Sequence, residues 1–215
     1  MTAKKIAARP FVTKAPEEML MTDLESFRQQ ALEMGAAAAE IIQANQIVVD
    51  ERVRLKCTVP RCLRAGETPN CPPYTPELDV IRKAFARFSW GILLKTHLKP
   101  IENYASKSGQ EQSLLFHQKS GKIVYEIEKL AYKHGYHLAM GLGGGSCKDY
   151  LCRGLICQFM DSGRCRFPHQ ARPAMEAMGI DVIDLISKVE WEAYPLLDDL
   201  SQIPCAISVG LVLVY

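Results

Sequence analysis

The chain has 215 residues, of which 48% are hydrophobic and 23% are charged, and its formal net charge is +2. This balance is that of a globular protein, and the absence of any long basic run argues against binding to nucleic acid or anionic membranes. No apolar stretch reaches the roughly 20 residues of a membrane-spanning helix. Residues 1–16 carry four Lys or Arg residues without an apolar core behind them, so they do not resemble a secretory signal. We therefore expect a cytoplasmic protein with a flexible arm over residues 1–16 and a single domain over residues 17–215.

Helices and strands alternate in the predicted first third of the chain. Apolar residues at helical spacing predict a helix from Leu24 to about Ala44, with Asp23 as its N-cap. The alternation in residues 53–56 predicts a short strand. A loop with five prolines follows over residues 58–76.

The remaining predicted elements continue this alternation. They are a helix over 76–88, a strand over Trp90–Leu98, a helix over Gln110–His134 that ends at Gly135, a strand over Tyr136–Leu142, short helices over 174–178 and 181–191, and a strand over Ala206–Tyr215. This order predicts an α/β layered domain with a small central sheet, and it places cysteine-rich metal-binding loops at strand ends.

Seven of the eight cysteines fall into two short windows. The first thiol group consists of Cys57, Cys62 and Cys71, and the second thiol group consists of Cys147, Cys152, Cys157 and Cys165. A reducing cytoplasm keeps thiols free, so clustered cysteines there indicate metal binding more strongly than disulfides.

The spacing within the groups favours iron–sulfur clusters over zinc. The second thiol group places four cysteines within 19 residues, which is sufficient to ligate one 4Fe–4S cluster without distant ligands. The first thiol group supplies only three ligands. It either holds a second cluster with an open or non-cysteine fourth position, borrows Cys205, or binds nothing by itself. Structural zinc remains an alternative, although zinc sites favour tighter cysteine pairs, often with histidine. Disulfides or free thiols are the third alternative.

Three segments resemble a known family. They are Val53–Leu78, which contains V-R-L-K-C and N-C-P-P-Y-T-P-E-L, Cys147–Cys157 (C-K-D-Y-L-C-R-G-L-I-C), and Cys165–Val182 (C-R-F-P-H-Q-A-R-P-A-M-E-A-M-G-I-D-V). The chain is similar in these segments to a family of uncharacterised prokaryotic proteins described as predicted metal-binding proteins, which are common in anaerobes. The resemblance extends from about Glu33 to the end of the chain. It implies a bound metal but no particular reaction.

Other residues near the cysteines have both a functional and an ordinary interpretation. The segment Gly143–Ser146 is a candidate phosphate cradle or a flexible entry to the second thiol group, and the second interpretation is favoured because the segment lacks the lysine and the glycine spacing of phosphate loops. His169 is a candidate fourth ligand or a surface residue, and Cys205 a candidate ligand or a buried structural thiol. Three arginines surround the last cysteine of the second group and would offset cluster charge or bind an acidic partner, namely Arg164, Arg166 and Arg172.

These observations lead to three functional hypotheses. The first is an iron–sulfur protein with one or two 4Fe–4S clusters that transfers electrons to or from a partner enzyme in an anaerobic pathway. The second is an iron–sulfur enzyme with an open iron site at the first thiol group. The third is a zinc-stabilised interaction module without chemistry.

Overall fold

A four-stranded antiparallel sheet forms the centre of the molecule in the computed structural model, which describes residues 9–99, 110–195 and 199–215. The strands lie in the order β1-β2-β4-β3, and their bounds are β1 Ala38–Gln43, β2 Trp90–Leu98, β3 Met140–Leu142 and β4 Ala206–Leu213. The predicted α/β class with a small central sheet is confirmed.

Helices cover both faces of this sheet. Their bounds are α1 Glu17–Glu33, α2 Glu51–Leu55, α3 Leu78–Phe85, α5 Gln110–Lys133, α6 Cys147–Tyr150, α7 Gln158–Ser162 and α8 Val182–Ser187, with 3-10 turns η1 Ala44–Gln46, η3 Glu176–Met178 and η4 Leu200–Gln202. None of the helices within the described ranges combines the length and apolarity that a membrane crossing requires.

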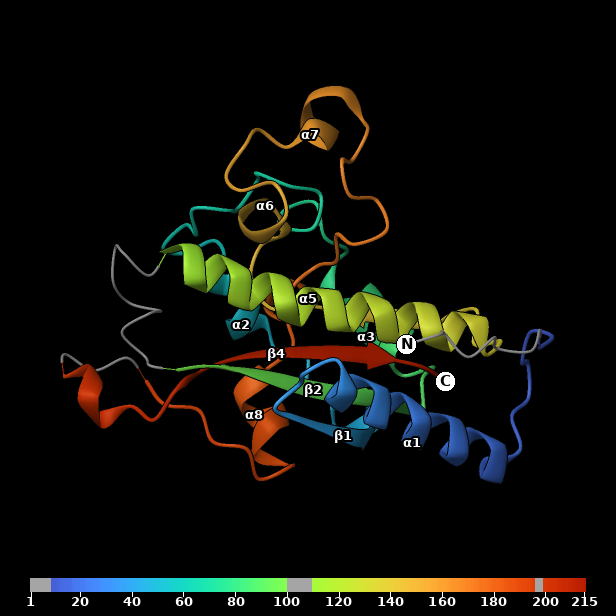
Figure 1. The fold of residues 1–215 in the computed structure, drawn as a ribbon. Coiled ribbons are helices and arrows are strands. Elements are labelled where there is room, and N and C mark those ends of the chain that lie inside the picture. Colours follow the sequence, from blue (N-terminus) through green and yellow to red (C-terminus); the bar gives the residue numbers. More distant parts are fainter. Residues whose placement is uncertain (1–8, 100–109, 196–198) are drawn as a thin grey trace.

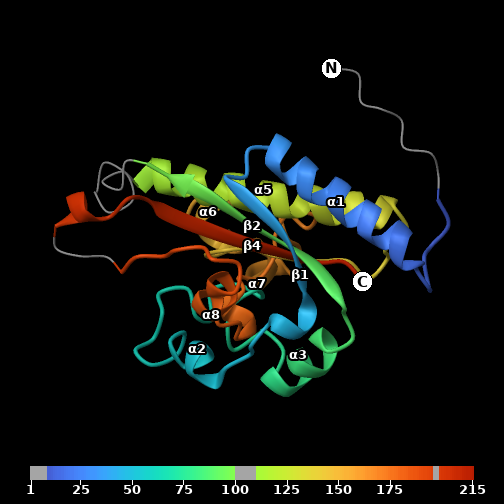
Figure 2. The same ribbon diagram turned by 90° about the horizontal axis from the view of Figure 1, so that it is seen from below.

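The alternation of side chains along β2 divides the core into two layers. Ile92 and Leu94 point to the face covered by α1 and α5, whereas Leu93 points to the face covered by α3, η3 and α8. Figure 2 shows α1 and α5 on one side of the sheet and α3 and α8 on the other. The molecule therefore has helix, sheet and helix layers, each held by burial of apolar surface.

The two central strands bring α5 close to the sheet. β4 pairs with β2 along its whole length, from Ala206 opposite Leu98 to Leu213 opposite Gly91, and with β3 on its other side. A Cβ on Gly210 would lie 2.4 Å from Cγ2 of Val124, so only glycine permits α5 to pack at this distance.

The predicted helix over residues 24–44 is wrong in its second half. α1 ends at Glu33, and Gly35 follows with φ of +93°, a left-handed conformation that ends helices. The chain then turns into β1, whose Ala39 and Ile42 are buried. The alanines of this segment favour a helix by intrinsic preference, but pairing with β2 decides the outcome.

Asp23 is not an N-cap, because α1 begins six residues before it. Its buried carboxylate accepts a hydrogen bond from Tyr136 Oη at 2.8 Å and lies 3.1 Å from His134 Nδ1. It also forms an ion pair with Arg9. Asp23 therefore connects α1 to the segment after α5.

Two predicted strands differ from the structure. Residues 53–56 form part of helix α2, because Asp50 caps the segment by accepting a hydrogen bond from Arg52 N at 2.7 Å. The strand predicted over residues 136–142 is shortened to β3, because residues 136–139 form a turn in which Ala139 N donates to Tyr136 O. The helices around residues 76–88 and 110–134, the strands β2 and β4, and the Asp181 cap of α8 agree with the sequence.

Residues 9–16 of the predicted arm contact the domain, while residues 1–8 lie outside the described part of the chain. Val12 N donates to Gly135 O at 2.9 Å, and Ala15 N donates to the hydroxyl of Tyr215 at 3.2 Å. The division of the chain into an arm and a domain stays a prediction.

Candidate metal centre

The second thiol group lies on an excursion that leaves the sheet after β3 and returns to the same point. Gly143 N donates to Pro173 O and Met175 N donates to Gly143 O, both at 2.9 Å. Residues 144–173 project from this closure, and Figure 1 shows α6 and α7 beyond α5. The loop is thus fixed to the sheet at both of its ends.

Two residues seat α6 at the base of this excursion. Ser146 caps the helix by accepting a hydrogen bond from Lys148 N at 3.3 Å. Tyr150 is buried against α5, where a Cβ on Gly121 would lie 3.1 Å from the ring. These contacts fix Cys147, the first residue of α6.

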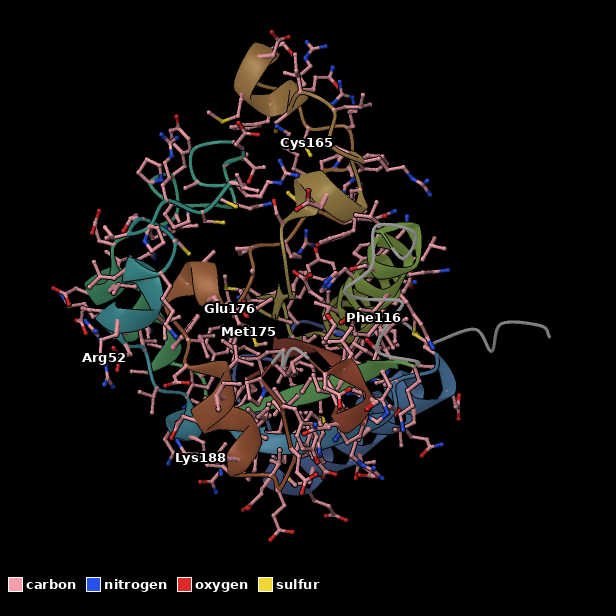
Figure 3. The ribbon with its side chains drawn as sticks, turned by 90° about the vertical axis from the view of Figure 1, so that its left-hand side faces the viewer. Arg52, Phe116, Cys165, Met175, Glu176 and Lys188 are labelled. Carbon is pink, nitrogen blue, oxygen red and sulfur yellow. The ribbon has the colours of Figure 1, made fainter. Side chains whose placement is uncertain are left out.

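The four cysteines of the second thiol group line one small cavity of about 20 Å³. Cys147 and Cys157 are buried, and Cys152 and Cys165 are half-buried. Residues 68–70 of the first cysteine loop close another side of this cavity. Figure 3 shows Cys165 in the projecting lobe, away from the sheet. The chain therefore brings together all four thiols that the sequence predicts as ligands of one cluster.

The surroundings of Cys147 favour its neutral thiol as long as no metal is bound. Burial raises the pKa of Cys147 to about 11, although hydrogen bonds from Asn70 and Thr68 oppose this shift. Asn70 Nδ2 lies 3.5 Å from Cys147 Sγ. A metal that bound here would have to displace the proton from this thiol, and the amide of Asn70 would then donate to the thiolate.

Polar contacts join the two cysteine loops. Cys71 Sγ lies 3.8 Å from Ser146 Oγ. Lys148 forms an ion pair with Glu67, and Arg64 Nη2 lies 2.5 Å from an Asp149 carboxylate oxygen. The loop that carries the first thiol group thus packs directly beside the second.

The first thiol group does not share a single cavity as the second does. Cys57 and Cys62 line a cavity of about 620 Å³ together with Cys205, whereas Cys71 lies beside Ser146. Burial raises the pKa of Cys57, and the neighbouring Cys62 and Cys71 add to this shift. Within the described ranges, no three His, Cys, Asp or Glu side chains are arranged so as to hold a single ion.

The sequence predicts that the first cysteine loop follows a strand. In the structure, however, Cys57 comes after helix α2. Only β3 leads directly into a cysteine loop. The two loops meet through their side chains rather than by emerging from neighbouring strands.

The histidine and the three arginines that the sequence suggests near the last cysteine differ in exposure and in their contacts. His169 and Arg164 are exposed. Arg166 Nη1 donates to Ile156 O at 2.7 Å, within the lobe. Arg172 Nε donates to Glu128 Oε2 at 2.6 Å and so ties the end of the excursion to α5.

Sequence reasoning missed three polar residues of the large cavity. Glu176, His117 and Ser208 come from η3, α5 and β4, and His117 Nδ1 lies 3.3 Å from Ser208 Oγ. Glu176 offered one signal, because it is the sole charged residue within the apolar segment A-M-E-A-M-G-I. Nothing distinguished His117 within a helix rich in polar residues.

Known proteins give one informative comparison. No curated protein and no solved structure matches the chain significantly. The family profile described as "Predicted metal-binding protein (DUF2284)" matches residues 40–214. This span contains all eight cysteines and both cavities. The chain belongs to this family of predicted metal-binding proteins.

Proposed function

We propose that the second thiol group holds a 4Fe–4S cluster and that the protein transfers electrons to or from a partner protein. The observation that carries this proposal is the single cavity lined by Cys147, Cys152, Cys157 and Cys165. Four thiolates are the complete ligand set of such a cluster, which supplies reversible one-electron chemistry when bound.

The spacing of the four thiols in the sequence supports a cluster more than a single zinc ion. Zinc sites favour tighter cysteine pairs, often together with histidine. The residues that line the small cavity include no histidine. A zinc-stabilised interaction module is therefore the weaker alternative.

The residues of the lobe suit transfer to another protein. Cys147 and Cys157 lie on the buried side of the cavity, whereas Cys152 and Cys165 approach the surface. Arg164 and Arg166 are exposed near the outer cysteine. Positive charge beside a redox centre attracts an acidic partner and raises the association rate.

The large cavity favours an enzyme as the second candidate function. Cys57 and Cys62 line it, so iron bound at the first thiol group would face a molecule in the cavity. Cys205 lines the same cavity and is a further candidate ligand.

Anaerobic metal and sulfide analysis tests the proposal. We expect about four iron and four sulfide per chain, or about eight of each if the first thiol group holds a second cluster. Cys152→Ser should remove the visible absorbance and the signal of the reduced cluster in electron paramagnetic resonance. Cys205→Ser, which leaves all four thiols of the small cavity in place, should retain the absorbance of the cluster at the second thiol group. A colourless protein that contains zinc without sulfide would contradict the proposal and leave the interaction module.

A further inference from the structure

The large cavity has the size and the lining of a small-molecule site. Its volume of about 620 Å³ falls within the range of about 300–1,000 Å³ typical of such sites. Aliphatic side chains from α2, α8 and β4 form much of its wall, among them Val53, Ile183, Ile186 and Val209. Ile183 is 63% exposed on α8. An apolar ligand would cover this surface and gain free energy by removing it from water.

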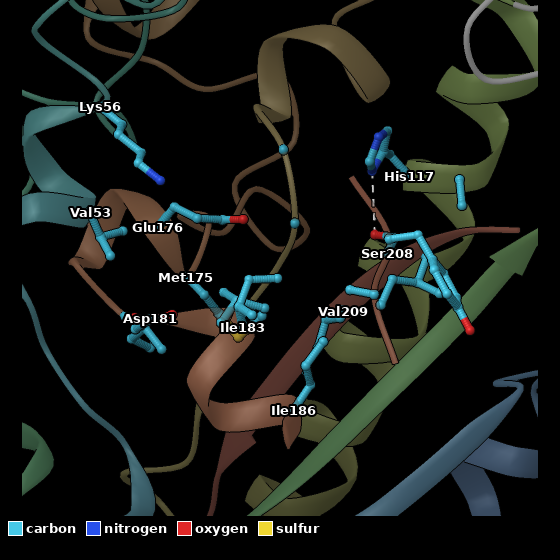
Figure 4. Close-up of a pocket in the computed structure, with 18 of the residues that line it drawn as sticks. Val53, Lys56, His117, Met175, Glu176, Asp181, Ile183, Ile186, Ser208 and Val209 are labelled. Carbon is cyan, nitrogen blue, oxygen red and sulfur yellow. Dashed lines mark hydrogen bonds between the residues drawn. The ribbon is translucent and has the colours of Figure 1, made fainter. Parts of the chain in front are cut away.

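One acidic side chain is directed into this apolar space. Glu176 extends from η3 between the α2 side of the cavity and His117 (Figure 4). It is exposed, yet the protein encloses it strongly enough that burial raises the pKa of its carboxyl. Both observations hold if the accessible surface of Glu176 faces the cavity, whose wall it forms.

Within the described part of the chain, Glu176 forms no ion pair with a cationic side chain. Within the described ranges, the only hydrogen bond to its carboxylate comes from its own backbone N–H, and no nearby cation lowers its pKa. Lys56 lies on the same side of the cavity but forms no ion pair with it. An enclosed carboxylate without a cation is costly, and a cationic ligand would offset that cost.

The facing wall does not supply the missing charge. Burial lowers the pKa of His117, so its imidazole is neutral at neutral pH. Its Nδ1 lies 3.3 Å from the hydroxyl of Ser208. The neighbouring acid Asp181 is occupied in capping α8, where it accepts a hydrogen bond from Asp184 N at 3.1 Å. Glu176 is therefore the acidic group that this cavity offers to a ligand.

We propose that the large cavity binds a small molecule with an apolar body and a cationic amine, and that Glu176 holds the amine. This site goes beyond electron transfer and does not require the 4Fe–4S cluster. If the first thiol group carries a metal, the same ligand would lie beside it, because Cys57 and Cys62 line the same cavity.

Calorimetric titration with three probes that share one aliphatic body tests the proposal. The probes are 3-methylbutylamine, 3-methylbutan-1-ol and 3-methylbutanoate, added to the protein as purified at mildly alkaline pH, which favours the ionised carboxyl because burial raises the pKa of Glu176. We expect the amine to bind about tenfold more tightly than the alcohol, because a charge-assisted contact replaces a neutral one. The carboxylate should bind most weakly.

Variants separate the two parts of the site. Glu176→Gln should remove the preference for the amine and leave the affinity for the alcohol within about twofold. Ile183→Ala should weaken the amine and the alcohol by similar factors, since it shortens the apolar wall. Glu40→Gln, at an exposed position on β1, is the matched control and should change nothing.

Two results would overturn the proposal. One is equal affinity for the amine and the alcohol in the wild-type protein, as expected if Lys56 neutralises Glu176 in solution. The other is loss of bound metal in Glu176→Gln, which would identify Glu176 as a metal ligand beside Cys57. Metal content, measured on the same samples, keeps these results separate from failure of the cluster proposal.

Discussion

The sheet with its covering helices and the thiol lobe, which comprises residues 55–76 and 144–173, obtain their order in different ways. Ile92, Leu93 and Leu94 of β2 are fully buried between two helical layers. In the lobe, by contrast, Leu63 is 86% exposed and Ile156 is 75% exposed. The lobe depends on turns, ion pairs and closure at its ends, so it buries too little apolar surface to offset its own ordering entropy. If the second thiol group holds a metal as we propose, we expect that metal to stabilise the lobe and not the sheet.

The largest expected effect is the loss of the metal centre in Cys157→Ser. Serine cannot replace the thiolate at this buried position, so we expect the cluster absorbance to disappear. Far-ultraviolet circular dichroism should stay largely native, because α1, α5 and the sheet do not depend on the lobe. Cys205→Ser should retain the absorbance of the cluster at the second thiol group, because Cys205 does not line the small cavity. Unfolding of the whole chain by Cys157→Ser would show that the metal also holds the sheet together.

A substitution in the core of the sheet should lower the stability of the whole domain, whereas the matched substitution in the lobe should not. Phe27 is fully buried under the sheet, with its ring centroid 5.1 Å from that of His134. Phe27→Ala should lower the free energy of unfolding by about 3–5 kcal/mol, measured by urea titration, because it leaves a cavity. The matched variant Phe159→Ala removes a ring that is 43% exposed in the lobe, and it should cost less than about 1 kcal/mol. Equal costs would remove the distinction between the two regions.

The smallest expected effect concerns the contacts between the two cysteine loops. Lys148→Met removes the ion pair with Glu67, and we expect a change of about 1 kcal/mol or less in the free energy of unfolding. Metal release to a chelator should become a few-fold faster, because the two loops are then less firmly joined. Lys129→Met removes a pair within α5, with Glu126, and serves as the control. Equal release rates in the two variants would show that the inter-loop contacts do not retain the metal.

The sequence pattern was sufficient to predict those helices and strands whose own residues show a clear apolar run or stripe. β2 begins with a short apolar run and is followed by Pro100, and α5 has a long apolar stripe that stops at Gly135. β1 was missed because its short A-A-E-I-I-Q segment follows Gly35 within an alanine-rich stretch, and a single glycine does not exclude a longer helix. Only pairing with β2 distinguishes these alternatives, and that pairing is not local.

The site was predictable to a similar degree. Cysteine spacing predicted that the thiols of the second group lie together, because they are close in sequence, and all four line the small cavity. The role of Asp23 was not predictable, since its partners Tyr136 and His134 lie more than 100 residues away. The same holds for Glu176, whose significance depends on a cavity built from α2, α5, α8 and β4. Such long-range arrangements leave almost no trace in local composition.

The position of β4 has a consequence for how the protein is made. β4 follows the other strands in chain order, yet it lies between β2 and β3 and is the strand with which β3 pairs. During synthesis on the ribosome, β3 therefore emerges before the strand with which it pairs. The sheet cannot be completed until residues 206–213 have left the exit tunnel. If the second thiol group holds a metal, we expect its stable insertion to follow translation, and a transcript that stops before residue 206 would yield a chain in which β3 has no partner strand.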